Sequence, residues 1–165
     1  RYPESLADTG SAPLDPVVLI LDRLQDPGNL GTILRTAWAV GLKEVWLTKG
    51  TADPFAAKPI RAGMGAQFAL RIRAFDDLEA AWSCLQAHGY QSLWLAGPRG
   101  QVSVFDEGFD CHRSGIVIGN EANGIVDDRF GRWVTIPMPG NAESLNAAQA
   151  ATVFLFDAVR RQILR

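Results

Sequence analysis

Two polar side chains, Ser144 and Asn146, stand between a Pro- and Gly-containing turn and an alanine-rich segment. Two prolines and a glycine at residues 137–140 prevent a strand from continuing there, because proline lacks an N–H group and fixes φ. Ser and Asn side chains accept hydrogen bonds from the free N–H groups of a helix start. We therefore expect both to cap the next helix, beside amides that could hold a ligand. Taken alone, this stretch is better explained as the start of an ordinary capped helix.

A glycine-containing loop at residues 119–124 follows a fully apolar run, and ligand loops of α/β sheets lie at such strand ends. Ile125 and Val126 replace the Lys and Ser or Thr of a P-loop, which disfavours hydrolysis of nucleoside triphosphates. The pair Gly63 and Gly65 lacks the third glycine of a dinucleotide fingerprint. No Gly-x-Ser-x-Gly elbow is present, so hydrolase chemistry is also disfavoured.

The composition, with 47% hydrophobic and 21% charged residues among 165, is that of one soluble domain. The sequence contains neither a long apolar run nor a signal peptide, so we expect a cytoplasmic protein without a membrane span. The spacing of the few cysteines and histidines predicts no metal site: Cys84, Cys111, His88 and His112.

The net charge of −2 gives no bulk electrostatic sign of nucleic-acid binding. Thirteen of the 16 basic residues are nevertheless Arg, whose planar fork suits phosphate. One stretch is crowded with basic side chains, and either a solvated face or a phosphate-binding cluster explains it: Lys58, Arg61, Arg71 and Arg73.

The apolar pattern predicts an α/β fold with about five or six mostly parallel strands and helices on both faces of the sheet. We expect strands at residues 17–21, 44–47, 68–75, 92–96, 115–118 and 133–138, with a short extension at 102–105. The strand at 68–75 is expected to be exposed or at an edge. Helices are expected at about residues 29–41, 77–88 and 146–162. Residues 51–65 predict a loop with one helical turn, and residues 119–131 a loop with a brief helix.

The two ends of the chain differ in character. Residues 1–16 are rich in Pro, Gly, Ser, Ala and Asp and follow no initiating Met, which predicts a linker after a missing N-terminal piece. The last helix is apolar nearly all round, so we expect it to be enclosed. Its polar end should emerge into solvent: Arg160, Arg161 and Gln162.

Three segments, taken in order, resemble the SpoU (TrmH) family of the SPOUT class of RNA methyltransferases. They read Asn29-x-Gly31-x-x-x-Arg35-Thr36-Ala37, Gly119-x-Glu121-x-x-Gly124 and Ile136-Pro137-Met138-x-Gly140-x-x-x-Ser144-Leu145-Asn146. The resemblance extends over nearly all of residues 17–162. Gly63, where many relatives have a small hydroxyl residue, and Gln149, in a usually more apolar helix start, depart from the pattern.

This resemblance implies methyl transfer from S-adenosyl-L-methionine to a ribose 2′-OH of rRNA or tRNA. It also implies a deep trefoil knot at the C-terminal end of the sheet, an exception to the rule against threading, and a homodimer with active sites near the subunit interface. Residues 17–165 would form the catalytic domain, after a linker and a small RNA-binding domain. The implied cofactor contacts are Ala96, Gly97, Ile118, Gly119, Ile136, Met138 and Leu145.

The resemblance further assigns catalytic roles to Arg35, Asn29, Glu121, Ser144 and Asn146. Arginine stays protonated near neutral pH and is a poor general base, so we expect Arg35 to bind phosphate and stabilise the developing alkoxide. Asn29 and Glu121 would orient Arg35 and hold RNA. Simple helix caps and scaffold ion pairs are the structural alternatives.

Two other functions fit the same sequence. A non-catalytic RNA-binding or dimerisation module with this fold would bind no cofactor. Another SPOUT branch would methylate a base rather than a ribose.

Overall fold

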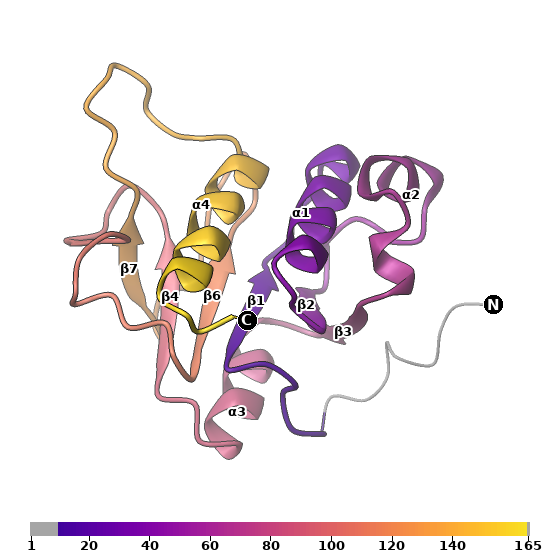
Figure 1. Cartoon of the computed structure of the whole chain (residues 1–165), viewed down its shortest axis with the longest axis horizontal. Coiled ribbons are helices and arrows are strands. Elements are labelled where there is room, and N and C mark those ends of the chain that lie inside the picture. The colour runs from indigo at the N-terminus through magenta and orange to yellow at the C-terminus, as the bar shows by residue number, and fades with distance from the viewer. Residues whose placement is uncertain (1–9, 165) are drawn as a thin grey trace.

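A single parallel sheet of seven strands organises the computed structural model, which describes residues 10–164 (Figure 1). The strands are β1 (Val17–Leu21), β2 (Glu44–Thr48), β3 (Arg71–Phe75), β4 (Ser92–Ala96), β5 (Val102–Ser103), β6 (Ser114–Ile118) and β7 (Arg132–Thr135). Their order in the sheet is β3-β2-β1-β6-β4-β7-β5, and all neighbours run parallel. The carboxyl ends of the strands therefore meet at one edge, where ligand loops gather.

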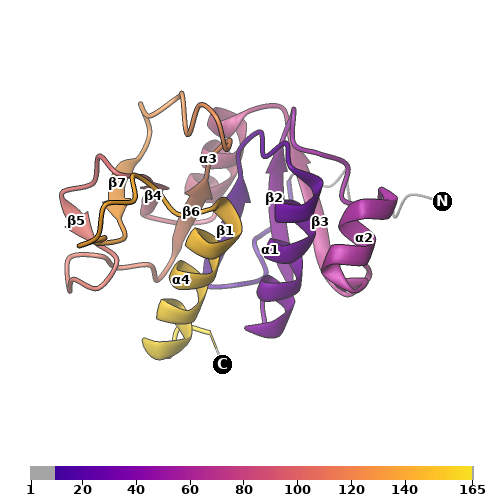
Figure 2. The ribbon, with the colours of Figure 1, turned by 90° about the horizontal axis from the view of Figure 1, so that it is seen from above.

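Helices cover both faces of this sheet, as the alternating pattern predicted (Figure 2). The helices are α1 (Pro27–Ala39), α2 (Ala57–Gly63), the 3₁₀ helix η2 (Ala66–Phe68), α3 (Leu78–Ala87) and α4 (Ala147–Arg160). One apolar core joins α1 and α4 to the sheet, and a second lies under α3. Strand β1 contributes alternate side chains to both cores and is buried throughout.

Several boundaries differ from the prediction. Residues 57–63 form a complete helix, α2, instead of one turn in a loop, whereas residues 119–131 contain no helix. Strand β7 ends at Thr135, because Pro137 and Pro139 interrupt the ladder. Strand β3 begins only at Arg71, after η2, and lies at the sheet edge as expected.

Arg73 is fully buried, so a solvated face or a phosphate cluster is the wrong interpretation for this residue. Its guanidinium lies 4.4 Å from the ring centroid of Trp46 and 3.9 Å from the Glu44 carboxylate. Helix α3 covers this side of the edge strand, and Arg73 donates a hydrogen bond to Cys84 on that helix. The burial of Glu44 raises the pKa of its carboxyl group, against the hydrogen bond from Leu14.

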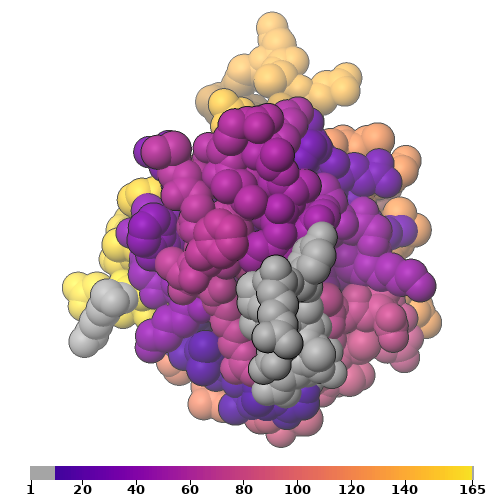
Figure 3. Space-filling model, turned by 90° about the vertical axis from the view of Figure 1, so that its right-hand side faces the viewer, coloured from indigo at the N-terminus to yellow at the C-terminus, as the bar shows by residue number. Residues whose placement is uncertain are grey.

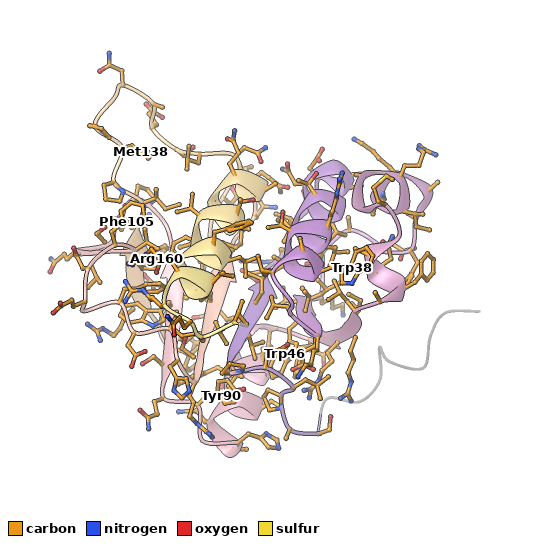
Figure 4. The ribbon with its side chains drawn as sticks, in the orientation of Figure 1. Trp38, Trp46, Tyr90, Phe105, Met138 and Arg160 are labelled. Carbon is orange, nitrogen blue, oxygen red and sulfur yellow. The ribbon has the colours of Figure 1, made fainter. Side chains whose placement is uncertain are left out.

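The linker prediction can be followed only for residues 10–16, because residues 1–9 lie outside the described part of the chain. Asp15 accepts hydrogen bonds from the backbone N–H groups of Lys43 and Glu44, and its own carbonyl accepts one from Tyr90. Residues 10–16 thus contact the amino end of the sheet, near Tyr90 (Figure 4). Desolvation raises the pKa of Asp15 there.

Helix α4 is not enclosed in the single chain. Phe156 is 53% exposed and Gln149 is also exposed, so one face of the helix meets solvent. At the C-terminal end of the helix, Arg161 does not extend freely into solvent as expected. It donates hydrogen bonds to the Asp157 carboxylate and to the carbonyls of Val104 and Asp106. The helix end is therefore tied to the segment that follows β5.

Candidate active site at the carboxyl edge of the sheet

A cavity of about 500 Å³ lies beyond the carboxyl ends of β4 and β6, within the size range of small-molecule sites. The loops after β4 and β6 form part of its wall, and β7, the first half of α4 and the segment between them form the rest. This last segment projects from the body of the molecule and carries Met138 (Figures 3 and 4).

The structure brings every residue predicted to contact a cofactor to this one cavity. They are Ala96, Gly97, Ile118, Gly119, Ile136, Met138 and Leu145. Each belongs to the end of a strand or to the loop after it, so the parallel arrangement of β4, β6 and β7 is sufficient to assemble them. Their side chains are small or apolar, which leaves backbone groups as the main polar partners for a ligand.

At two positions in the cavity wall, Gly97 and Gly119, the packing leaves no room for a Cβ atom. A Cβ atom on Gly97 would lie 2.5 Å from the Trp133 ring, and one on Gly119 would lie 2.6 Å from the Gly124 backbone. The second contact belongs to a tight loop in which Asn120 pairs with Gly124. Asn120 accepts from the N–H groups of residues 122 and 123 and donates to the Arg23 carbonyl, which fixes the loop against the end of β1.

A chain of hydrogen bonds connects three loops at the cavity. Glu121 accepts from the backbone N–H groups of Gln25 and Asp26 at 3.1 and 3.0 Å and from the Asn29 amide at 3.2 Å. Asn29 in turn accepts from the amide of Asn146 at 2.9 Å. Asn29 thus contacts two other candidate catalytic residues, Glu121 and Asn146, directly.

These contacts change the ionisation of Glu121. Partial burial alone would raise the pKa of its carboxyl group. The hydrogen bonds from Gln25, from its own backbone, from Asn29 and from Asp26 outweigh burial and lower the pKa below the ordinary value. Glu121 is therefore a carboxylate that holds the loops together, and no Arg pairs with it among the described residues.

Only one of the two predicted caps is formed. Asn146 is the N-cap of α4 and accepts from Ala148 at 2.8 Å. Ser144 lines the cavity but is exposed, and within the described chain it makes no hydrogen bond. Likewise Asp26, rather than Asn29, caps α1. Asn29 is consequently left with a side chain directed to Glu121 and Asn146.

Arg35 does not join this group. It is exposed on α1, six residues after Asn29 and thus about 9 Å farther along the helix axis. It does not line the cavity, and it forms no ion pair with any described residue. The predicted orientation of Arg35 by Asn29 and Glu121 is therefore absent within one chain.

Sequence reasoning missed several residues of the cavity wall, among them Arg99, Trp133 and Glu143. The signal was available, since Arg99 follows Gly97 by two residues and Glu143 directly precedes Ser144. The described residues contain no cluster of three or more His, Cys, Asp or Glu side chains that could hold a metal ion. No helix in the described range is long and apolar enough to cross a membrane.

Comparison with known proteins gives a consistent family. The model of the SpoU rRNA Methylase family matches residues 16–156. An uncharacterised tRNA/rRNA methyltransferase from Synechocystis is 38% identical over 87% of the chain and 53% of its own length. The 23S rRNA (guanosine-2′-O-)-methyltransferase RlmB of Xanthomonas axonopodis is 36% identical over 89% of the chain and 59% of its own length.

The solved structures agree. The SpoU methyltransferase AviRb from Streptomyces viridochromogenes, crystallised with the cofactor AdoMet, superposes with a TM-score of 0.84 at 34% identity. The match covers 98% of this chain and 66% of AviRb. The chain spans about half the length of the curated relatives it matches.

Proposed function

Since this chain belongs to the SpoU rRNA Methylase family, we propose that it is an S-adenosyl-L-methionine-dependent methyltransferase acting on a ribose 2′-OH of rRNA or tRNA. The observation that carries the proposal is the cavity at the carboxyl edge, which gathers residues from the second and third family segments. The first segment joins them through Asn29. RlmB, named as a guanosine-2′-O-methyltransferase, supports ribose rather than base as the target.

The cavity suits the proposed cofactor. Ile118, Ile136 and Leu145 offer apolar surface for an adenine ring, and the glycines at 97 and 119 leave backbone groups accessible to its polar edge. When bound, the cofactor supplies an electrophilic methyl group on a sulfonium. The work left to the chain is to place the ribose hydroxyl in line with that methyl group and to accommodate the proton that leaves.

The residues divide this work. The chain Glu121–Asn29–Asn146 fixes the loops that form the cavity, because each member holds the next. Ser144, with no protein partner among the described residues, is available to hydrogen-bond the ribose. Arg35 binds RNA phosphate and stabilises the alkoxide that develops at the 2′-oxygen.

A homodimer completes the site in this proposal. Arg35 lies outside the cavity of its own chain, so a second copy must supply it. Exposed aromatic side chains on the two helices that lie side by side support this arrangement, with Trp38 on α1 51% exposed and Phe156 on α4 53% exposed (Figure 2). Aromatic side chains are enriched in protein–protein interfaces.

We also propose the deep trefoil knot, with residues 17–165 as the catalytic domain and residues 1–16 as a linker from an RNA-binding domain. The hydrogen bonds of Arg161 to residues 104 and 106 support the knot, because they hold that segment across the end of α4. The greater length of the relatives supports a further domain.

The decisive experiment incubates the protein with methyl-labelled S-adenosyl-L-methionine and RNA from cells that lack its gene. Label in a 2′-O-methylnucleoside after complete digestion is the expected result. Label in a methylated base would indicate the base-modifying alternative. Absence of cofactor binding in calorimetric titration would instead favour the non-catalytic module.

A further inference from the structure

Two unpaired charges of opposite sign line the candidate cofactor cavity. Among its described lining residues the charged ones are Arg99, Glu121 and Glu143. Glu121 is occupied by the N–H groups of Gln25 and Asp26 and by Asn29. Arg99 and Glu143 form neither an ion pair nor a hydrogen bond with any residue that the structure describes, so the cavity offers one free guanidinium and one free carboxylate.

Arg99 is presented by a loop that is held on both sides. The Gly97 N–H group donates to the Val134 carbonyl, and Gly100 packs so closely on β7 that a Cβ atom would lie 2.6 Å from the Thr135 nitrogen. Between these points the Arg99 guanidinium lies 5.6 Å from the ring centroid of Trp133. Cation–π contact of this kind restricts a long side chain while leaving its N–H groups free.

Trp133 is itself fixed. Its ring packs against Gly97, where a Cβ atom would clash, and its indole N–H donates to Asp128 at 3.3 Å. Glu143 lines the same cavity from another part of the chain, the segment that leads to the Asn146 cap of α4. The two charges therefore come from two different segments that line one cavity.

We infer that Arg99 and Glu143 bind the α-amino-acid end of the cofactor, Arg99 its carboxylate and Glu143 its ammonium group. This inference rests on the proposed function, since it takes S-adenosyl-L-methionine as the ligand. An amino-acid zwitterion requires one partner of each sign, and the guanidinium fork matches a carboxylate with two parallel hydrogen bonds. The remaining lining side chains are uncharged, apart from the occupied Glu121.

A pair of nucleoside probes tests this directly, without relying on catalysis. S-adenosylhomocysteine carries the amino-acid end, whereas 5′-deoxy-5′-methylthioadenosine lacks it. Calorimetric titration is expected to show that Arg99→Gln and Glu143→Gln each weaken S-adenosylhomocysteine binding about tenfold. Binding of the methylthio compound should change less than twofold. Arg99→Lys, which keeps the charge but loses the fork, should fall between the two.

Arg132→Gln is the matched control, because Arg132 is an exposed arginine next to Trp133 that does not line the cavity. It should bind both probes like the unaltered protein. Equal losses for both probes in Arg99→Gln would overturn the inference, since the substitution would then have altered the cavity as a whole. A loss of RNA affinity with unchanged S-adenosylhomocysteine binding would also overturn it and assign Arg99 to an RNA phosphate.

Titration of the unaltered protein with the two probes gives different results according to whether the cofactor or only the role of Arg99 and Glu143 is wrong. If the unaltered protein binds neither probe, the proposed cofactor is wrong and the inference falls with it. If it binds both probes equally well, the proposed function stands and only the role of Arg99 and Glu143 is overturned.

Discussion

The carboxylate of Glu121 accepts hydrogen bonds from two donors just before α1 and from Asn29 in its first turn, and these bonds set its pH response. Because the folded-state pKa is lowered, Glu121 adds stability that is fully present above its ordinary pKa of 4.5 and is lost as pH falls through the lower folded value. Glu121→Gln should remove this contribution, since its amide NH₂ would face N–H donors.

The measurement is the difference in unfolding midpoint between the two proteins from pH 7 to pH 3. It should be constant above about pH 4.5 and shrink below it. Asp26, whose pKa is also lowered, chiefly by its hydrogen bond from the Asn29 backbone, titrates in both proteins and cancels. A difference that stays constant down to pH 3 would show that Glu121 does not act as a carboxylate there.

Asn146 and Ser144 separate capping from chemistry. Asn146→Ala should lower the free energy of unfolding by about 1 kcal/mol or more, because it removes the cap of α4 and the contact with Asn29. Ser144→Ala should leave stability unchanged, since the described chain gives Ser144 no partner, and should lower kcat if the hydroxyl contacts ribose. Chemical denaturation and methyl-transfer rates measure the two effects; equal stability losses would refute the distinction.

At this scale the family resemblance named Ala96, Ile118 and Ile136 as cofactor contacts, and these residues line one cavity. They meet there because the carboxyl ends of parallel strands lie at one edge of the sheet. The contact of Asn29 with Asn146 depends instead on the distance between two helices separated by more than 100 residues, which no local pattern contains. Arg73 was misjudged for the same reason, because its burial is caused by α3.

Among the elements, α1 and α2 approach each other so closely at Gly31 that there is no room for a side chain at that position. A Cβ atom on Gly31 would lie 2.5 Å from the Pro59 carbonyl and 2.7 Å from the Ala62 side chain. Gly31→Ala should therefore push α2 away from α1 and lower the free energy of unfolding by ~1–3 kcal/mol. Gly140→Ala is the control, as nothing lies within 4 Å of its added carbon.

Denaturant unfolding monitored by circular dichroism measures this difference, and equal stability of the two variants would contradict the packing argument. Gly31 belongs to the first family segment, but the sequence alone could not show why glycine is needed at this position. The region of α2 was expected to be mostly loop, because Pro59 and Gly63 weaken its helical pattern. Only the packing against α1 makes the helix complete.

For the molecule as a whole, the alternating pattern predicted parallel strands and helices on both faces but not the order β3-β2-β1-β6-β4-β7-β5. Strand order depends on contacts between distant segments, and each right-handed crossover admits either neighbour. The prediction that the last helix is enclosed was also wrong for a single chain, since Phe156 and Gln149 are exposed. In the proposed homodimer the same apolar composition is explained by a second copy covering that face.

If each cavity uses Arg35 of the other copy, two inactive variants should restore activity when they form a mixed dimer. The Arg35→Ala variant keeps an intact cavity, whereas the Ala96→Phe variant keeps Arg35 but has a filled cavity. Each homodimer should be inactive, with cofactor binding lost only in Ala96→Phe. After unfolding and refolding together in equal amounts, half of the dimers should contain one intact cavity and one intact Arg35, giving about a quarter of the unaltered rate per chain. Thermal unfolding confirms that both variants fold, and zero activity in the mixture would place Arg35 in its own chain's site.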